Sequence, residues 1–563
     1  MSATADTTLR STRPLPKLRV LLPGWYSIGW GTALLVMLPV LAVFWLALFP
    51  TENIWPHLAS TVLPVYIQST LILLVGTGAL SVAIGVGTAW LVTLCNFPGR
   101  RIFEWALLLP FAIPAYVIAY IYTDLLEYAG PVQIALRDLF GWETARDYWF
   151  PEIRSIGGAI SMLTLVLYPY VYLLARASFL EQSLSIRDAS RMLGCTPWQS
   201  FLRVSLPVAR PAIAVGLSLV SMETINDFGT VDYFAVKSMS AGVYDAWLNM
   251  GNVGAAAQIS SLMMIFVVLL ITLERAARAK SRQFTSADRY RTIERYRLTP
   301  MRAWLAFLAC ALPVTLGFLV PFISLADMSI AHLDQFSDTD FLGYAANSFS
   351  LSATTAVLAT VIAVVLAYSK RLHADKRSLQ FAARLSNLGY ALPGAVLAIG
   401  VIIPLAAFDN SVDAFMREHF NISTGLLLSG TPFALVFAYC VRFLAVSGGT
   451  VDSSLGKVTP NMDMAARSLG AHSLRTLREV HLPLIRGGLL TAVLVVFVDC
   501  MKELPATLIL RPFNYDTLAT FVYQYASDER IEACSPAALL IVLVGIIPVI
   551  LLSRTITATR SSR

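Results

Sequence analysis

Twelve long apolar runs constrain what this chain can fold into. Each run is long enough to cross about 30 Å of hydrocarbon, which takes roughly 20 helical residues. Mean hydropathy is +0.66, and 14% of residues are charged, whereas a soluble domain has roughly a quarter. We therefore predict an all-α polytopic membrane protein. The predicted spans are 28–49, 67–94, 102–126, 156–180, 208–232, 256–274, 303–325, 349–369, 385–407, 425–446, 484–510 and 535–553.

Lysine and arginine alternate between the loops, as the positive-inside rule requires. Loops 50–66 and 326–348 contain none, whereas the linker 275–302 contains nine against two acids. The rule places this linker and both termini in the cytoplasm, and we expect a bacterial inner-membrane protein. Because the net charge of +7 lies in short loops, it indicates topology and no nucleic-acid partner. Run 28–49 lacks a following small-residue cleavage site, so it reads as a retained first span.

Metal and catalytic chemistry have little support in the sequence. The six cysteines and six histidines form no ligand-spaced cluster, and no nucleophile motif stands out. The phosphate-loop pattern G-x-x-x-x-G-K-[S/T] does not occur. We therefore expect no cofactor, no metal site and no enzymatic activity in this chain.

A polar, basic island occurs twice between the apolar runs. Residues 188–207 and 464–483 align without a gap at an offset of 276, with seven of twenty positions identical. Residues 112–119 match 391–398 at an offset of 279. Six spans per half give both halves one orientation, which predicts a parallel repeat with a pathway at its interface. The predicted division is a tail 1–27, a first repeat 28–274, a linker 275–302, a second repeat 303–553 and a tail 554–563.

Each island reads as a helix, a glycine stop and a second short helix. Gly194 and Gly470 suit the left-handed residue that ends a helix, and Thr196 with Gln199 forms a capping box. Apolar residues then recur every three positions, and the closing Leu-Pro is expected to limit the helix before the next span. The two apolar stripes are Trp198, Phe201 and Val204, and Leu474, Leu477 and Val480.

Two interpretations of the islands are open. Each is either an amphipathic loop on the lipid surface or a helix inserted into a groove of a cytoplasmic partner, with its apolar stripe as the anchor. Duplication at equivalent positions favours the second interpretation, because two islands suit a two-fold partner.

The islands resemble the EAA loop of binding-protein-dependent ABC-transporter permeases, which ends in Leu-Pro. In that family the loop is the coupling helix that docks on the ATPase. The acidic position holds Asp188 in copy one but Met464 in copy two, so we expect unequal contacts, with mutations in copy one costing more. The coupling residues that the resemblance implies are Asp188, Ala189, Arg191, Gly194, Trp198, Phe201, Pro207, Ala465, Ala466, Arg467, Gly470, Leu474, Leu477 and Pro483.

The resemblance covers essentially the whole chain and implies a fused pair of permease domains with the type I ABC importer permease fold. Two copies of an ATP-binding subunit are expected on the cytoplasmic side, so ATP would be hydrolysed by another chain. A substrate-binding protein is expected on the outer side of the lipid bilayer.

An acidic cluster ends the fifth predicted span of each half. The offset of 276 pairs Glu223 with Asp499 and Asp227 with Glu503. Ionisable residues of membrane spans are functional candidates, so these carboxylates are candidates for a pathway or gate. A solvated helix end, or neutralisation of Glu503 by Lys502, is the alternative. The candidate set is Glu223, Asn226, Asp227, Asp499, Lys502 and Glu503.

The substrate is suggested by a second resemblance. Segments 223–236 and 502–520 resemble ferric-iron importer permeases, and thiamine and polyamine permeases share parts of them. Oxygen ligands suit trivalent iron and a cationic polyamine alike, and the resemblance favours iron. An ion-coupled secondary transporter also has two six-span halves, but charges are almost absent from the middle of the predicted spans, and the paired islands need a partner.

Overall fold

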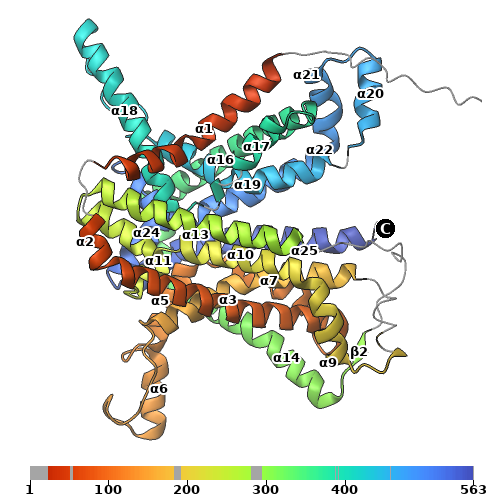
Figure 1. Cartoon of the computed structure of the whole chain (residues 1–563). Coiled ribbons are helices and arrows are strands. Elements are labelled where there is room, and N and C mark those ends of the chain that lie inside the picture. The colour runs from red at the N-terminus through yellow and green to blue at the C-terminus, as the bar shows by residue number, and fades with distance from the viewer. Residues whose placement is uncertain are drawn as a thin grey trace, which may run out of the picture.

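The protein is an all-α polytopic membrane protein. The computed structural model describes residues 23–50, 55–182, 190, 192–279, 295–386, 389–390, 392–456 and 458–561. Eleven helices in these ranges are long and apolar enough to cross a membrane, or twelve when the bent pair Arg100–Ala112 and Ala115–Phe140 counts as one span. Figure 1 shows the long helices running side by side. The count agrees with the twelve predicted spans.

The elements of the first half precede residue 280. They are α1 (Pro23–Leu48), α2 (Trp55–Ser60), α3 (Leu63–Leu94), β1 (Cys95–Asn96), α4 (Arg100–Ala106), η1 (Leu109–Ala112), α5 (Ala115–Leu126), α6 (Pro131–Phe140), α7 (Ile156–Glu181), α9 (Pro197–Ser200), η2 (Phe201–Ser205), α10 (Leu206–Asn226), α11 (Gly229–Tyr233), α12 (Met239–Tyr244), η3 (Asp245–Asn249) and α13 (Val253–Ala279).

The elements of the second half follow residue 294. They are β2 (Tyr296–Arg297), α14 (Pro300–Val314), η4 (Thr315–Leu319), α15 (Val320–Ile330), η5 (Leu333–Ser337), α16 (Thr339–Leu372), α17 (Arg377–Ser386), α18 (Gly394–Phe420), α19 (Pro432–Leu455), α20 (Pro460–Ser468), α21 (Ser473–Thr476), η7 (Leu477–His481), α22 (Leu482–Met501), α23 (Pro505–Leu510), α24 (Leu518–Ser527) and α25 (Ile531–Ser561).

The third predicted span of each half is broken by proline. In the first half the chain bends by 91° between η1 and α5, where Pro114 is extended at ψ 144°. In the second half α18 begins directly after Pro393. Proline removes a backbone donor and disfavours helix at the residue before it. The predicted span 102–126 is therefore a bent pair of helices, and the helix of the predicted span 385–407 begins only at Gly394.

The fifth span of each half begins earlier and ends earlier than predicted. Residues 197–226 and 473–501 are each one helical span, whereas the predictions were 208–232 and 484–510. The expected helix stop at Leu-Pro is wrong, because π-helical turns lead into it in both halves. The backbone N–H of Leu206 bonds to the carbonyl of Phe201, and that of Leu482 to Leu477. A π turn shifts the hydrogen bonds by one residue and lets the helix pass the proline.

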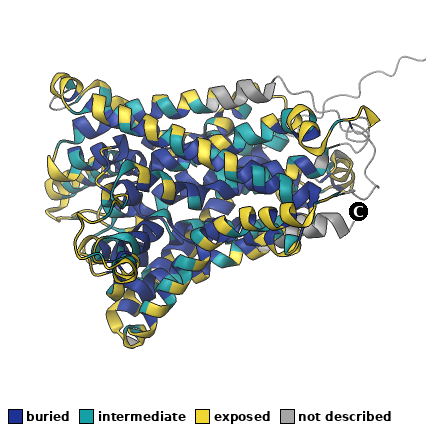
Figure 2. Ribbon diagram, turned by 90° about the horizontal axis from the view of Figure 1, so that it is seen from below, coloured by how far each residue is buried: buried dark blue, intermediate teal, exposed yellow. Residues whose placement is uncertain are grey.

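The first span of each half packs against the other half. Helix α1 contacts α16, α17 and α18, while α15 contacts α5 and α14 contacts α3. One buried core therefore joins α3, α5 and α7 to α14, α15 and α25, and the second joins α1 and α13 to α16, α18 and α19. Buried residues run along the middle of the bundle in Figure 2. The halves are interleaved in space although they are consecutive in sequence.

The two ends of the bundle differ in what they carry. In Figure 1, α9, α20 and α21 lie at one end, together with the C-terminal end of α25. Helix α6 and the far end of α18 project at the other end, on opposite flanks. Both islands therefore lie at the same end of the molecule.

Candidate functional site

A cavity of about 110 Å³ lies between the two halves. All six residues predicted as pathway or gate candidates line it. Most of its lining comes in pairs separated by 276 residues, so it lies where the repeated halves face each other. These pairs are Val166/Arg442, Leu167/Phe443, Glu223/Asp499, Asn226/Lys502, Asp227/Glu503, Phe228/Leu504 and Gly229/Pro505.

The cavity lies deeper than the outer end of the spans. Tyr170 and Arg442 both line it, and they lie near the middle of α7 and α19. The acidic cluster does end the fifth span of each half, as expected, but this end lies level with the middle of α7 and α19. The cluster is brought inward because α10 and α22 stop at Asn226 and Met501.

Two of the four carboxylates cap short helices. Asp227 accepts the backbone N–H groups of Thr230 and Val231, both at 3.1 Å. Glu503 accepts the N–H of Ala506 at 3.1 Å. Free N–H groups at a helix start favour a carboxylate, so this equivalent pair starts α11 and α23 after each span breaks.

Three contacts between lining side chains join a carboxylate to a donor. Lys502 lies 2.9 Å from Asp499, and Arg442 lies 3.5 Å from Glu503. The hydroxyl of Tyr390 donates to Glu223 at 2.7 Å. The predicted alternative, in which Lys502 neutralises Glu503, is wrong, because Lys502 pairs with the residue three positions before it.

Sequence reasoning missed Arg442, Tyr390 and Tyr170. Arg442 is 5% exposed and is one of the few charged residues near the middle of a span. The signal was present, because an arginine within predicted span 425–446 is a functional candidate by default. Tyr390 directly precedes the repeated motif of the third span, and its hydroxyl lies 3.5 Å from that of Tyr170.

Two buried side chains at the cavity keep unused hydrogen-bonding atoms. Both amide atoms of Asn226, and Nε and Nη1 of Arg442, have no hydrogen-bond partner among the described residues. Buried polar groups are normally satisfied, so these atoms are available to a molecule in the cavity. Among the same residues no group of three or more His, Cys, Asp or Glu side chains is arranged to hold a metal ion.

Within the described residues, the glycine stops and the second helices of the islands have the predicted local structure. Gly194 and Gly470 adopt φ values of +77° and +79°, in the left-handed region that favours glycine. Thr196 and Gln199 form the capping box, and His472 provides no side-chain cap in copy two. Asp188, Ala189 and Arg191 lie outside the described residues.

The apolar stripes of the islands are only partly exposed. Phe201 and Leu477 are each 6% exposed, so the prediction that they anchor a partner is wrong. Phe201 instead packs within the chain against Trp90, with ring centroids 5.0 Å apart. Trp198 and Leu474 remain 56% and 55% exposed. Of the other coupling candidates, Gly194, Ala465, Arg467, Gly470 and Pro483 are exposed, Pro207 is half-buried and Ala466 is buried.

Sequence comparison relates these features to known proteins. Residues 81–277 match the family described as binding-protein-dependent transport system inner membrane component. An Fe(3+)-transport system permease protein of Haemophilus influenzae is 26% identical over 87% of this chain and 89% of its own length. Residues 81–277 therefore belong to this family, and the chain over most of its length is similar to permease subunits of ABC importers.

Further relatives of this permease differ in named cargo. A second Haemophilus influenzae protein, named as a ferric transport system permease, is 22% identical over 94% of this chain and 84% of its own. The molybdenum transport system permease protein of Escherichia coli is 26% identical over 36% of this chain and 89% of its own. The two ferric relatives align with both halves, whereas the molybdenum relative has the length of one.

Internal contacts brace the second island of the permease. Asp463 contacts Arg371 at 2.9 Å and His481 at 2.5 Å. The hydroxyl of Tyr368 donates to the carbonyl of Ser473 at 2.6 Å. The acid one position before Met464 therefore holds the island against α16 and is used within the chain.

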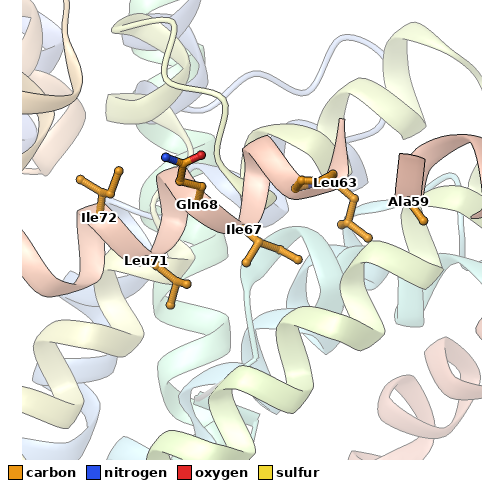
Figure 3. A pocket seen from close by; sticks show the side chains of 7 residues that line it. Ala59, Leu63, Ile67, Gln68, Leu71 and Ile72 are labelled. Carbon is orange, nitrogen blue, oxygen red and sulfur yellow. The ribbon is translucent and has the colours of Figure 1, made fainter. Parts of the chain in front are cut away.

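The permease also has an apolar surface groove of about 570 Å³ (Figure 3). Its single polar lining side chain is Gln68, and it lies along a membrane-spanning helix, so its chemistry suits lipid chains. The groove is lined by Ala59, Leu63, Pro64, Ile67, Gln68, Leu71 and Ile72. The cavity between the halves is the site that carries charged groups.

Proposed function

We propose that this permease imports ferric iron delivered by an extracytoplasmic binding protein. The observation that carries the proposal is the cavity between the halves, in which carboxyl groups outnumber basic groups by four to two. Carboxylate and phenol oxygens are hard donors that suit a trivalent cation. The ferric-transport relatives, which align with most of the chain, support the same substrate.

The proposed transport cycle uses both ends of the molecule. Two copies of an ATP-binding subunit dock at the end that carries the islands, which is cytoplasmic together with both termini. The binding protein docks at the other end, between α6 and the far end of α18. Closure of the ATPase pair moves the islands and rocks the repeats 28–274 and 303–553 against each other, which opens the cavity to alternate sides.

The exposed apolar residues of the islands define a revised docking surface. Leu193 and Leu469 are separated by 276 residues and are 83% and 86% exposed. Trp198 and Leu474 are a second exposed pair at the same offset. An equivalent apolar pair on each island suits two identical partner grooves, with the apolar residues as anchors.

The docking proposal is tested by charging the exposed pair. Leu193→Asp combined with Leu469→Asp should abolish co-purification of the ATPase and leave the thermal stability of the permease unchanged. Leu139→Asp is the matched control, because Leu139 is 75% exposed on α6 at the opposite end. Stoichiometric ATPase binding by the double variant would contradict the docking surface.

The substrate proposal is tested by uptake into proteoliposomes that contain the whole importer. Radiolabelled ferric iron on the binding protein should enter only with ATP, and thiamine, spermidine and molybdate should not compete. Glu223→Gln with Asp499→Asn should reduce uptake at least tenfold and leave ATPase binding intact. ATP-dependent uptake of a competitor in place of iron would overturn the substrate.

An oxyanion is the second candidate substrate. It is favoured by one observation, the Nη1 atom of Arg442 at the cavity, which has no hydrogen-bond partner among the described residues and could donate to an anionic oxygen. The relative named for molybdenum transport belongs with this candidate. In the same uptake assay, ATP-dependent molybdate transport without iron transport would select it.

A further inference from the structure

The two halves contribute unequally to the charge of the cavity. The acidic positions are kept in both, as Glu223 with Asp499 and as Asp227 with Glu503. The basic positions are not kept. Lys502 corresponds to Asn226, and Arg442 corresponds to Val166, at the same offset of 276. The second half therefore supplies both basic groups of the cavity.

We propose that Lys502 and Arg442 are tethered counter-cations of the empty pathway. They form ion pairs with the cavity carboxylates when no cargo is present, and a cation that enters the cavity displaces them. The proposal deepens the proposed function, on which it rests for the cationic class of the cargo. It makes Lys502 and Arg442 specificity-determining residues that exchange places with the substrate.

The contacts of the two basic groups suit such an exchange. Lys502 reaches Asp499 at 2.9 Å through a flexible four-carbon stem that can swing away. Arg442 is 3.5 Å from Glu503, and its Nε and Nη1 form no hydrogen bond to the described residues. The contact of Arg442 with Glu503 is therefore not the bidentate pairing that fixes an arginine on a carboxylate.

Electrostatics gives a reason for internal cations. A buried carboxylate without a counter-charge is unfavourable, and hydrogen bonds from Tyr390 and from backbone N–H groups to three of the four carboxyl groups supply no positive charge. An empty cavity without internal cations would therefore trap cations from solution. A transported ion must bind well enough to enter and weakly enough to leave. An ammonium and a guanidinium that compete for the same carboxylates weaken the hold on a trivalent ion, and they return when it departs.

The repeat supplies the substitutions that test this proposal. Lys502→Asn and Arg442→Val each introduce the residue found at the equivalent position of the first half. The probe is Tb³⁺, a hard trivalent cation whose emission is sensitised by nearby aromatic rings. Tyr116, Tyr170 and Tyr390 line the cavity. Titrations use the complete importer in lipid nanodiscs, and size-exclusion and ATPase co-purification verify that each variant assembles.

Lys502→Asn should bind Tb³⁺ at least tenfold more tightly than the wild type. Asp499→Asn added to Lys502→Asn should return the affinity to the wild-type value, and Lys502→Arg should keep it there. Signal that persists in Glu223→Gln with Asp499→Asn measures binding elsewhere and is subtracted. In ferric uptake, Lys502→Asn should lower both KM and kcat, because the cation enters more readily and leaves more slowly.

Equal or weaker Tb³⁺ binding by Lys502→Asn would overturn the proposal. Arg442→Val should shift the affinity in the same direction, and it decides the question if Lys502→Asn does not assemble. The outcome is separable from the choice of substrate. If the wild-type importer carries molybdate and no iron, the proposed function fails, while the Tb³⁺ titration still shows whether these side chains compete with a cation.

Discussion

The crossing of α1 and α18 gives the sharpest prediction about stability. A Cβ atom added at Gly400 would lie 2.3 Å from the carbonyl oxygen of Pro39 and 2.8 Å from its carbonyl carbon. Close carbon–oxygen contacts in proteins are about 3.3 Å or longer, so α1 must withdraw by about 1 Å. The atoms in the way belong to the backbone, so no side-chain rotation relieves the clash.

Gly400→Ala should therefore destabilise the permease. Overpacking of a well-packed interface costs about 1–3 kcal/mol, and a clash with backbone belongs near the upper end of that range. Gly449→Ala is the matched control, because Gly449 lies inside the spanning helix α19 with nothing within 4 Å of its added Cβ. There the change should be neutral or stabilising by up to about 1 kcal/mol, since alanine favours helix.

The measurement is the thermal midpoint of each detergent-solubilised variant, followed by fluorescence-detected size exclusion at one heating rate. A fixed rate is needed because membrane proteins often unfold irreversibly, which makes the midpoint depend on the rate. We expect Gly400→Ala below the wild type and Gly449→Ala at or above it. Identical midpoints for the two variants would refute the interleaved packing of α1 on the second half.

Three further predictions concern the islands and the cavity. Phe201→Ala should cost about 3–5 kcal/mol through a buried cavity and lower the thermal midpoint. Trp198→Ala should lower the midpoint less, because Trp198 is 56% exposed, and should weaken ATPase co-purification. Asp463→Asn should release the second island from Arg371, and limited trypsin digestion should then cleave that island at least severalfold faster than in the wild type. Tyr390→Phe should remove the hydrogen bond to Glu223, worth about 1–3 kcal/mol when a buried acceptor loses its donor, and slow iron uptake with ATPase binding unchanged.

The number of spans and the equivalent positions of the two halves could be predicted from the sequence. The breaks within the helices could not. A run of apolar residues predicts a span by its length, and the run over 102–126 stays apolar on both sides of the bend at Pro114. Hydropathy therefore does not register the break. The local signal is proline, but Pro169 lies inside helix α7 without ending it, because tertiary packing decides whether a membrane helix stops there.

The apolar stripe of each island does not stay on one face of its helix. Residues three apart on a helix differ by about 60° around its axis, since each residue turns about 100°. A stripe with that spacing therefore drifts from one face to another. Trp198 stays exposed while Phe201 turns inward between Trp90 and Phe179. The spacing identified the helix, and the face could be assigned only once its neighbours were known.

Helix geometry explains which side chains of the cavity form ion pairs. Adjacent residues on a helix point in different directions, whereas residues three apart meet. This explains why Lys502 binds Asp499 and leaves Glu503 to Arg442. Repeat alignment predicted which carboxylates occupy equivalent positions, and all four line one cavity. The partner of Glu503 comes from a different helix, so it could be identified only from the fold. Because the acids follow the two-fold repeat and the bases do not, the halves differ in what they contribute: both present carboxylates to the cavity, and the second half also provides Lys502 and Arg442, which pair with two of them.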